Sequence, residues 1–161
     1  MFSTRFAAAG YDPLPNYAVP DQGEPEGDYP LVLTSFRLRQ FVDDQHRNIP
    51  RLRSQEREPF IEIHPETAAG LGIVDGEWVK VATAAGKVRL KVRLNNALHP
   101  KVVCAPYGGW WQPCRELELP GYDALSSTGA NVNLLIPNAL IDPISASVPH
   151  RSRMCTILKE V

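Results

Sequence analysis

The segment from Phe60 to Trp111 constrains the fold of this chain most, because its turn signals leave almost no residues unassigned between successive elements. Phe60–Ile63 alternates in the manner of a half-buried strand. Pro65 stands where a helix begins, since its missing N–H costs nothing at the first helical position, and Gly70 or Gly72 can end that helix in a left-handed cap. The segment therefore predicts a strand at 60–63, a helix at 66–71 and strands at 77–83, 87–94 and 101–105.

Residues 87–94 have the clearest strand pattern in the sequence. Apolar residues at 88, 90, 92 and 94 face one side, and the cations Lys87, Arg89, Lys91 and Arg93 face the other. We interpret the cations as the solvated face of a sheet. Apolar runs at 31–34 and 154–159 predict two more strands. Five or six short strands with one or two helical turns predict a fold that is mainly β with short helices, a small mixed barrel.

Length and composition narrow the functional classes. A chain of 161 residues suits one domain. Its net charge of −1 argues against a nucleic-acid partner, and no apolar run approaches the roughly 20 residues that cross a bilayer, so we expect no membrane insertion. Residues 1–29 contain Pro and Gly runs that disfavour regular structure. We expect an irregular arm, a linker from an upstream domain, before a barrel domain at 30–161; a stand-alone protein with a loose tail is the alternative.

The sequence contains no pattern typical of a catalytic or metal site. Ser126 and Ser127 lie outside any G-x-S-x-G turn, and no two of the four histidines are spaced by two or four residues. His64 precedes the helix start at Pro65, which favours a capping role. The three cysteines, Cys104, Cys114 and Cys155, lack the spacing of a zinc site and are predicted to be reduced thiols. We therefore predict no catalytic residue, no metal ligand and no turnover by this chain alone.

Two polar segments could bind a ligand. The first runs from Thr34 to Asn48 and offers hydroxyl, guanidinium and amide groups. Arginine forks bind phosphate oxygens, amides can read heterocycle edges, and Asp43 and Asp44 would repel phosphate. The second runs from Gly129 to Arg151 and carries two Asn at alternate positions, 131 and 133. A plain surface loop and an Asn-rich turn are the alternative interpretations.

Seven segments, taken in order, carry a resemblance to a known family: LVLTS (31–35), QHRNIPRLR (45–53), EIHPETAAGLGIVDGEWVKV (62–81), GKVRLKVRL (86–94), GGWW (108–111), NVNLL (131–135) and DPISASVPHR (142–151). Together they resemble the C-terminal domain of the molybdopterin oxidoreductases related to dimethyl sulfoxide reductase. Within that family the chain is most similar to the thiosulfate/polysulfide reductase and acetylene hydratase type of subunit.

The resemblance implies a double-psi β-barrel, the aspartate-decarboxylase-like fold. It implies molybdopterin guanine dinucleotide as the ligand, two copies of which hold molybdenum or tungsten in the full enzyme; we expect none bound to the isolated domain. The implied partners are upstream domains of the same polypeptide and an iron–sulfur electron-transfer subunit. We expect the cytoplasm as the default compartment for this chain. The compartment of the parent, the larger enzyme of which this domain would be a part, is left open between the cytoplasm and the periplasm. The cofactor-binding residues implied are Thr34, Ser35, Arg37, Gln45 and Arg47 in the first segment, with Asn131, Asn133 and Arg151 in the second.

The chain also departs from the family pattern. Relatives commonly have Thr-Gly-Arg where residues 34–36 read Thr-Ser-Phe, and His-Ser where Asp43-Asp44 stands. The carboxylates would weaken contacts of Gln45 and Arg47 with an anionic ligand. Iron–sulfur cysteines and the domain with the metal ligand are absent from this sequence, so we expect a fragment of a larger enzyme.

A double-psi barrel that binds partner proteins is the alternative function. A ligand site requires the two polar segments to converge on one cleft, whereas an interaction module allows them on opposite faces. We further expect Trp110 and Trp111 to lie on a surface that upstream domains normally cover, which would favour self-association of the isolated domain.

Overall fold

The computed structural model of the protein describes residues 3–14, 16, 27–109, 111–139, 141–142 and 144–160. Its strands are β1 (Leu31–Phe36), β2 (Phe60–Ile63), β3 (Trp78–Ala82), β4 (Lys87–Leu94), β5 (Val102–Pro106) and β6 (Arg153–Lys159). Its helices are α1 (Thr4–Ala8), α2 (Pro50–Arg53) and α3 (Pro65–Gly70), with 3-10 helices η1 (Arg115–Leu117) and η2 (Val132–Leu135). Each predicted strand is present, and its bounds differ from the expected ones by two residues at most.

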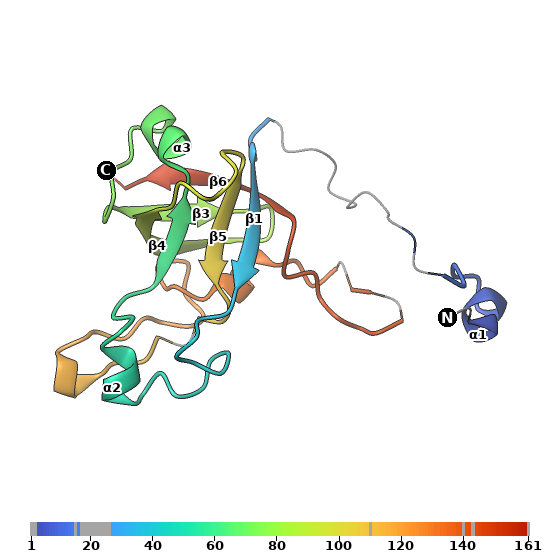
Figure 1. Ribbon diagram of the computed structural model, residues 1–161, viewed down its shortest axis with the longest axis horizontal. Coiled ribbons are helices and arrows are strands. Elements are labelled where there is room, and N and C mark those ends of the chain that lie inside the picture. Colours follow the sequence, from blue (N-terminus) through green and yellow to red (C-terminus); the bar gives the residue numbers. More distant parts are fainter. Residues whose placement is uncertain are drawn as a thin grey trace.

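The strands close into one barrel in the order β1-β5-β2-β4-β3-β6, and β6 pairs back with β1. β1 lies parallel to β5 and β2 lies parallel to β4, while the remaining neighbours are antiparallel. Parallel neighbours need long connections, and here these contain α2, α3 and other strands of the barrel. Figure 1 shows α3 at one end of the barrel and α2 among the loops at the other. The double-psi β-barrel predicted from the sequence is confirmed.

The barrel interior is filled by the apolar positions that alternate along each strand. On β4, Val88, Leu90 and Val92 are at most 3% exposed, as the alternation predicted, whereas Leu94 at the strand end is 37% exposed. Ile61 and Ile63 on β2 meet them from the parallel neighbour and are fully buried. Burying a side chain of this size stabilises the fold by about 1.5–3 kcal/mol. The apolar side chains inside the barrel therefore hold its strands together.

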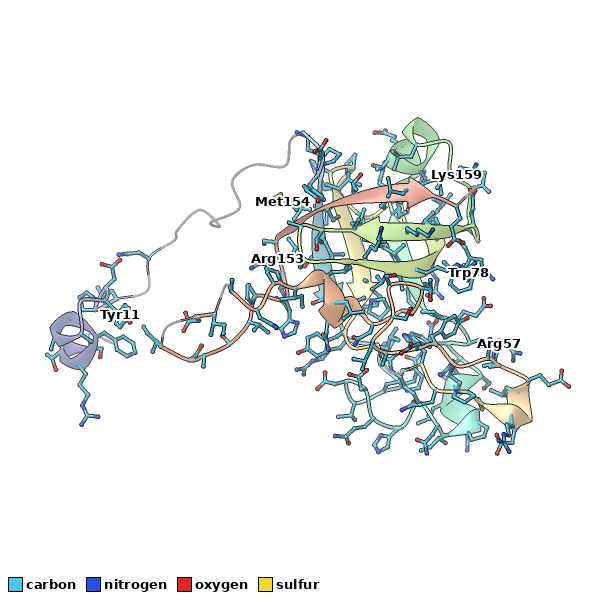
Figure 2. All side chains as sticks on the ribbon, turned by 180° about the vertical axis from the view of Figure 1, so that it is seen from behind. Tyr11, Arg57, Trp78, Arg153, Met154 and Lys159 are labelled. Atoms are coloured by element: carbon cyan, nitrogen blue, oxygen red, sulfur yellow. The ribbon has the colours of Figure 1, made fainter. Side chains whose placement is uncertain are left out.

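The cations of β4 lie on the outer face of the barrel, as predicted, and three of them are also paired there with carboxylates. Arg89 pairs with Glu160 at 2.7 Å, and its guanidinium lies 4.1 Å from the ring centroid of Trp78 (labelled in Figure 2). Lys91 pairs with Glu58 at 2.5 Å. Long cationic side chains can lay their stems on aromatic surface while the charged ends reach carboxylates. These pairs tie the segment before β2 and the residue after β6 to the outer face of β4.

α3 begins as predicted from the sequence. Pro65 is its first residue, and His64 Nδ1 accepts a hydrogen bond from the backbone N–H of Glu66 at 3.2 Å. Gly72 follows with a φ of +66°, the left-handed conformation expected there. The capping role of His64 is therefore confirmed, and this histidine is occupied locally.

The N-terminal segment is not wholly irregular. Ser3 caps α1, because its hydroxyl oxygen accepts a hydrogen bond from the backbone N–H of Phe6 at 3.3 Å. This N–H lies in the first turn of the helix and has no partner within the helix itself. The described residues 9–14, 16 and 27–30 form no helix or strand. Their role as a linker stays a prediction. In the described part of the chain no helix is both long and apolar enough to cross a membrane.

Candidate functional site

The candidate site forms where β1 and β5 end side by side. The two strands are parallel, with Ser35 opposite Ala105 and Phe36 opposite Pro106, so the segments that follow them leave the same edge of the barrel. Figure 1 shows both arrowheads directed at the layer of loops that contains α2. The first polar segment therefore starts beside residues 107–111, and this adjacency positions the rest of the site.

Both polar segments meet the backbone of Tyr107–Gly109. From the first, Arg47 donates from Nη2 to the Tyr107 carbonyl at 2.9 Å, and Asp44 accepts from the Gly109 N–H at 2.8 Å. From the second, the Cα of Asn131 lies 2.2 Å from the position that a Cβ on Gly109 would take. Only glycine allows this approach. Arg47 and Asn131 thus meet at one stretch of backbone, although neither lines a hollow.

Arg47 supports the site from inside instead of facing it, which corrects its predicted role as a phosphate ligand. Its side chain is 1% exposed, and the guanidinium carbon lies 4.4 Å from the ring centroid of Trp111. A second hydrogen bond runs to the carbonyl of Asp43 at 3.3 Å. Burial lowers the pKa of Arg47 to about 10, against an opposing effect of Asp44. The group stays charged near pH 7 and holds the first segment against residues 107–111.

Trp111 lies beneath a second buried arginine. Arg53 is fully buried with its guanidinium carbon 4.8 Å from the ring centroid of Trp111, and it donates from Nε to the carbonyl of Arg57 at 3.1 Å. Burial lowers the pKa of Arg53 as well. Trp111 itself is 2% exposed, so the prediction that its indole lies at the surface was wrong. Trp110 falls outside the described residues.

Asn131 is also occupied within the protein. Its Nδ2 donates to the Ala124 carbonyl at 2.8 Å, and its Oδ1 accepts from the N–H of Asn133 at 3.1 Å, which caps η2. The side chain of Asn131 is buried and that of Asn133 is exposed. The two amides therefore face different environments, and Asn131 fixes the path of the second segment while Asn133 is left accessible.

The remaining predicted residues divide into two groups. Arg37 is 78% exposed and pairs with Asp43 at 3.1 Å, so this carboxylate offsets a cation that was expected to bind phosphate. Gln45 and Arg151 are exposed. Thr34 and Ser35 instead line a hollow at the barrel edge. The structure thus brings Thr34 and Ser35 into one concave surface and places the exposed cations outside its lining.

The hollow is shallow and partly open to solvent, with room for little more than one water molecule. Its apolar wall consists of Leu33, Ala105, Val132 and Ile136, and its polar groups come from Thr34, Ser35, Tyr107 and His150. The Oη of Tyr107 and Nε2 of His150 are hydrogen-bonded at 3.1 Å. Ser35 donates to the backbone carbonyl of His150 at 3.2 Å. The hollow therefore joins the ends of β1 and β5 to η2 and to the segment before β6.

Neither Tyr107 nor the role of His150 was predicted from the sequence. The pair is separated by 43 residues, and no local pattern links a tyrosine after one strand to a histidine before another. The adjacent Gly108 and Gly109 did carry a usable signal, because paired glycines before bulky residues suggest close backbone packing. Among the described residues, no cluster of three His, Cys, Asp or Glu side chains is arranged to hold a metal ion.

A family model described as "Molydopterin dinucleotide binding domain" matches residues 31–153, from the start of β1 to the start of β6. The chain belongs to this family. It is a molybdopterin dinucleotide-binding domain of the kind found in molybdoenzymes related to dimethyl sulfoxide reductase, and the family predicted from the sequence is confirmed.

Individual relatives agree with the family. The chain is 36% identical over 124 residues to acetylene hydratase of Syntrophotalea acetylenica, which covers 73% of this chain and 17% of that protein. It is 33% identical over 151 residues to dopamine dehydroxylase of Eggerthella lenta, covering 91% of this chain and 14% of the relative. The solved structure of acetylene hydratase from Pelobacter acetylenicus superposes with a TM-score of 0.76 at 25% identity, over 98% of this chain and 23% of that one. The chain thus spans under a quarter of each of these relatives.

Proposed function

We propose that this domain closes over molybdopterin guanine dinucleotide in a larger molybdenum or tungsten enzyme and takes no catalytic part alone. The observation that carries the proposal is the meeting of both polar segments at Tyr107–Gly109, beside the hollow at the ends of β1 and β5. A barrel edge shaped by two segments almost 90 residues apart in sequence is typical of a ligand site and not of a plain surface loop.

The residues present fit such a group. The shallow hollow presents hydroxyl and imidazole groups beside an apolar wall, and such groups can contact the edge of a polar heterocycle. The exposed guanidinium groups of Arg37 and Arg151 suit phosphate oxygens. The cofactor would supply the redox-active metal. This chain would bind and orient it through Thr34 and Ser35 in the hollow, and through exposed Arg37, Gln45, Asn133 and Arg151 around it.

Arg47 and Asn131 have a supporting role in this proposal. Both side chains are buried and hydrogen-bonded to backbone, so they position the loops that carry the contacts. We further propose that the full enzyme holds two dinucleotides, as the family resemblance implies, and that upstream domains and an iron–sulfur subunit complete it. Relatives named for different substrates share this domain. We therefore assign the choice of substrate to other parts of the parent.

The test uses the intact parent enzyme with Arg37→Ala and Arg151→Ala combined. Denaturation in acid followed by chromatography would measure the guanine nucleotide released per mole of protein, and elemental analysis would measure the metal. The matched control is Arg39→Ala, which removes an exposed arginine of the same loop that lies outside the proposed set. We expect a lower nucleotide and metal content in the double variant and an unchanged content in the control.

Equal nucleotide content in the double variant and the parent would refute the assignment of these two arginines. A purified parent enzyme that releases no guanine nucleotide would refute the proposed cofactor itself. The alternative is that the domain binds a partner protein and not the cofactor. A parent enzyme that keeps its full cofactor content after substitution of all the exposed polar residues around the hollow would support this alternative.

A further inference from the structure

The antiparallel strands β4, β3 and β6 present an outer face that takes no part in the hollow. Alternation places Lys80 on this face, because its neighbours Val79 and Val81 are fully buried inside the barrel. Lys80 stands opposite Arg89 on β4 and opposite Leu158 on β6. Figure 2 views the barrel from the side of β3 and β6. The register thus puts Lys80 at the middle of a three-stranded face.

This face carries a cluster of positive charge. Lys87, two residues before Arg89 on β4, points to the same side as Arg89. Arg89 and Lys80 are register partners, and like charges directly opposite each other destabilise a sheet. Glu160 neutralises Arg89 at 2.7 Å, whereas Lys80 and Lys87 form no ion pair or side-chain hydrogen bond with any described residue. Two cations of the face therefore lack a carboxylate within the described part of the chain.

An uncharged stripe runs along β6 beside these cations. Met154, Thr156 and Leu158 alternate with the buried residues Cys155 and Ile157, so all three point outward. Leu158, the register partner of Lys80, is 47% exposed. Lysine stems can lie on apolar surface while their charged ends reach a carboxylate. The face is therefore complementary to a surface that presents an apolar side chain beside carboxylates.

Charge and chain entry indicate what covers this face. A two-fold dimer would bring the same lysines of two copies together, and like charges oppose such an interface. The chain spans under a quarter of the relatives named above, so most of a parent of that length lies outside it. β1 begins at Leu31, and Val32 is the register partner of Met154 on β6. The polypeptide that precedes β1 therefore reaches the barrel beside this face.

We propose that the outer face of β4, β3 and β6 docks an acidic surface of the parent polypeptide upstream of this chain. Lys80 and Lys87 form its ion pairs, and Leu158 forms its apolar contact. Carboxylates of the upstream part neutralise the two lysines and offset the repulsion between Lys80 and Arg89. This inference rests on the proposed function only in that both require a larger parent, and it makes no use of the cofactor.

The first experiment treats the intact parent enzyme with a water-soluble carbodiimide, which joins a lysine amine directly to a carboxylate in contact with it. Mass spectrometry then identifies the linked peptides. We expect Lys80 or Lys87 to be joined to an Asp or Glu of the parent polypeptide outside the 161 residues of this chain. The pair of Lys91 and Glu58, at 2.5 Å within the chain, is the positive control.

The second experiment measures how fast a lysine-acetylating reagent modifies each lysine in the parent and in the 161-residue chain. Lys80 and Lys87 should react about 2- to 5-fold more slowly in the parent, the factor that corresponds to an exposed ion pair. Lys101 is the internal control and should react equally fast in both. It is exposed and directly precedes β5, which lies opposite β3 in the strand order of the barrel.

Charge reversal separates docking from folding. Lys80→Glu puts a carboxylate opposite Arg89, so it should leave the Tm of the 161-residue chain unchanged or raise it. In the parent the same change sets a carboxylate against carboxylates, which should lower Tm and return the acetylation rate of Lys87 to that of the separate chain. Lys101→Glu is the matched control, and its effect on Tm should be the same in the parent and in the chain.

Three outcomes would overturn the inference. The first is that Lys80 and Lys87 react equally fast in the parent and in the chain. The second is that their crosslinks join them only to this chain, such as the acidic residues 21–28, to a second copy or to a separate subunit. The third is that Lys80→Glu changes the Tm of the parent no more than that of the chain. The nucleotide content of the parent is a separate measurement, so the proposed function can stand or fail independently.

Discussion

Gly109→Ala tests the claim that the two polar segments are fixed by a single close backbone crossing. A Cβ at this position would lie 2.2 Å from the Cα of Asn131 and 2.7 Å from its Oδ1. Real Cβ atoms essentially never approach another heavy atom closer than 3.0 Å. The nearest obstacle is backbone, which cannot rotate away as a side chain end can. The substitution must therefore move the segment before η2 or the segment after β5.

The expected cost follows from what has to move. Overpacking in a well-packed interior costs about 1–3 kcal/mol, and here the shift also strains the Asp44 contact to the Gly109 N–H and the capping bond of Asn131. We expect the free energy of unfolding to fall by about 3 kcal/mol or more, which lowers Tm by about 6–12 °C for a domain of this size. The assay is urea and thermal unfolding followed by circular dichroism.

Gly70→Ala is the matched control. Gly70 ends α3, has no heavy atom within 4 Å of the added Cβ and has no positive φ. Alanine in a helix is favoured over glycine by about 0.5–1 kcal/mol, so the control should be unchanged or slightly stabilised. A Gly109→Ala domain as stable as the Gly70→Ala domain would refute the close crossing, and with it the argument that this crossing shapes the site.

Three further predictions concern single groups. Arg47→Met leaves the Tyr107 carbonyl without its donor and should lower the free energy of unfolding by about 1–3 kcal/mol, whereas the exposed control Arg51→Met should change it little in the same urea titration. His64→Ala should cost about 1 kcal/mol through the lost cap of α3, and His64→Asp should restore it; equal midpoints for all three forms would contradict the capping role. Burial raises the pKa of Cys155 from 9.0 to about 12, so above pH 9 the unfolded chain releases a proton that the folded chain keeps. Stability should thus fall as the pH rises from 9 towards 12, and Cys155→Val should show a smaller fall in urea midpoint between about pH 8 and about pH 10.5.

Local patterns predicted the elements because their causes are local. The cap of α3 needs only His64, Pro65 and Gly72 in the correct order. The strand at 87–94 follows from alternation, since successive side chains must point to opposite faces. The short helix α2 was not predicted, because Pro50 is its only start signal. Three of its four residues, Pro50, Arg51 and Arg53, are equally typical of a polar loop.

The site was predicted only in part, because side-chain burial depends on contacts between distant segments. Arg47 looked like a phosphate ligand in a polar loop, yet Phe41 and Trp111 enclose its guanidinium. Asp44 looked unfavourable for an anionic ligand, yet it bonds to the backbone of Gly109. A charged residue in a loop can serve either purpose, and the sequence does not contain the distance that decides between them.

The sequence by itself determined the barrel strands, because hydrophobic alternation, proline and glycine act on neighbours within a few residues, and its seven ordered segments indicated the family by resemblance. Only the tertiary structure decided that the parallel ends of β1 and β5 bring Tyr107 to His150 and Gly109 to Asn131. The physical reason is that strand pairing, set by closure of the whole barrel, places residues that are far apart in sequence within hydrogen-bonding distance.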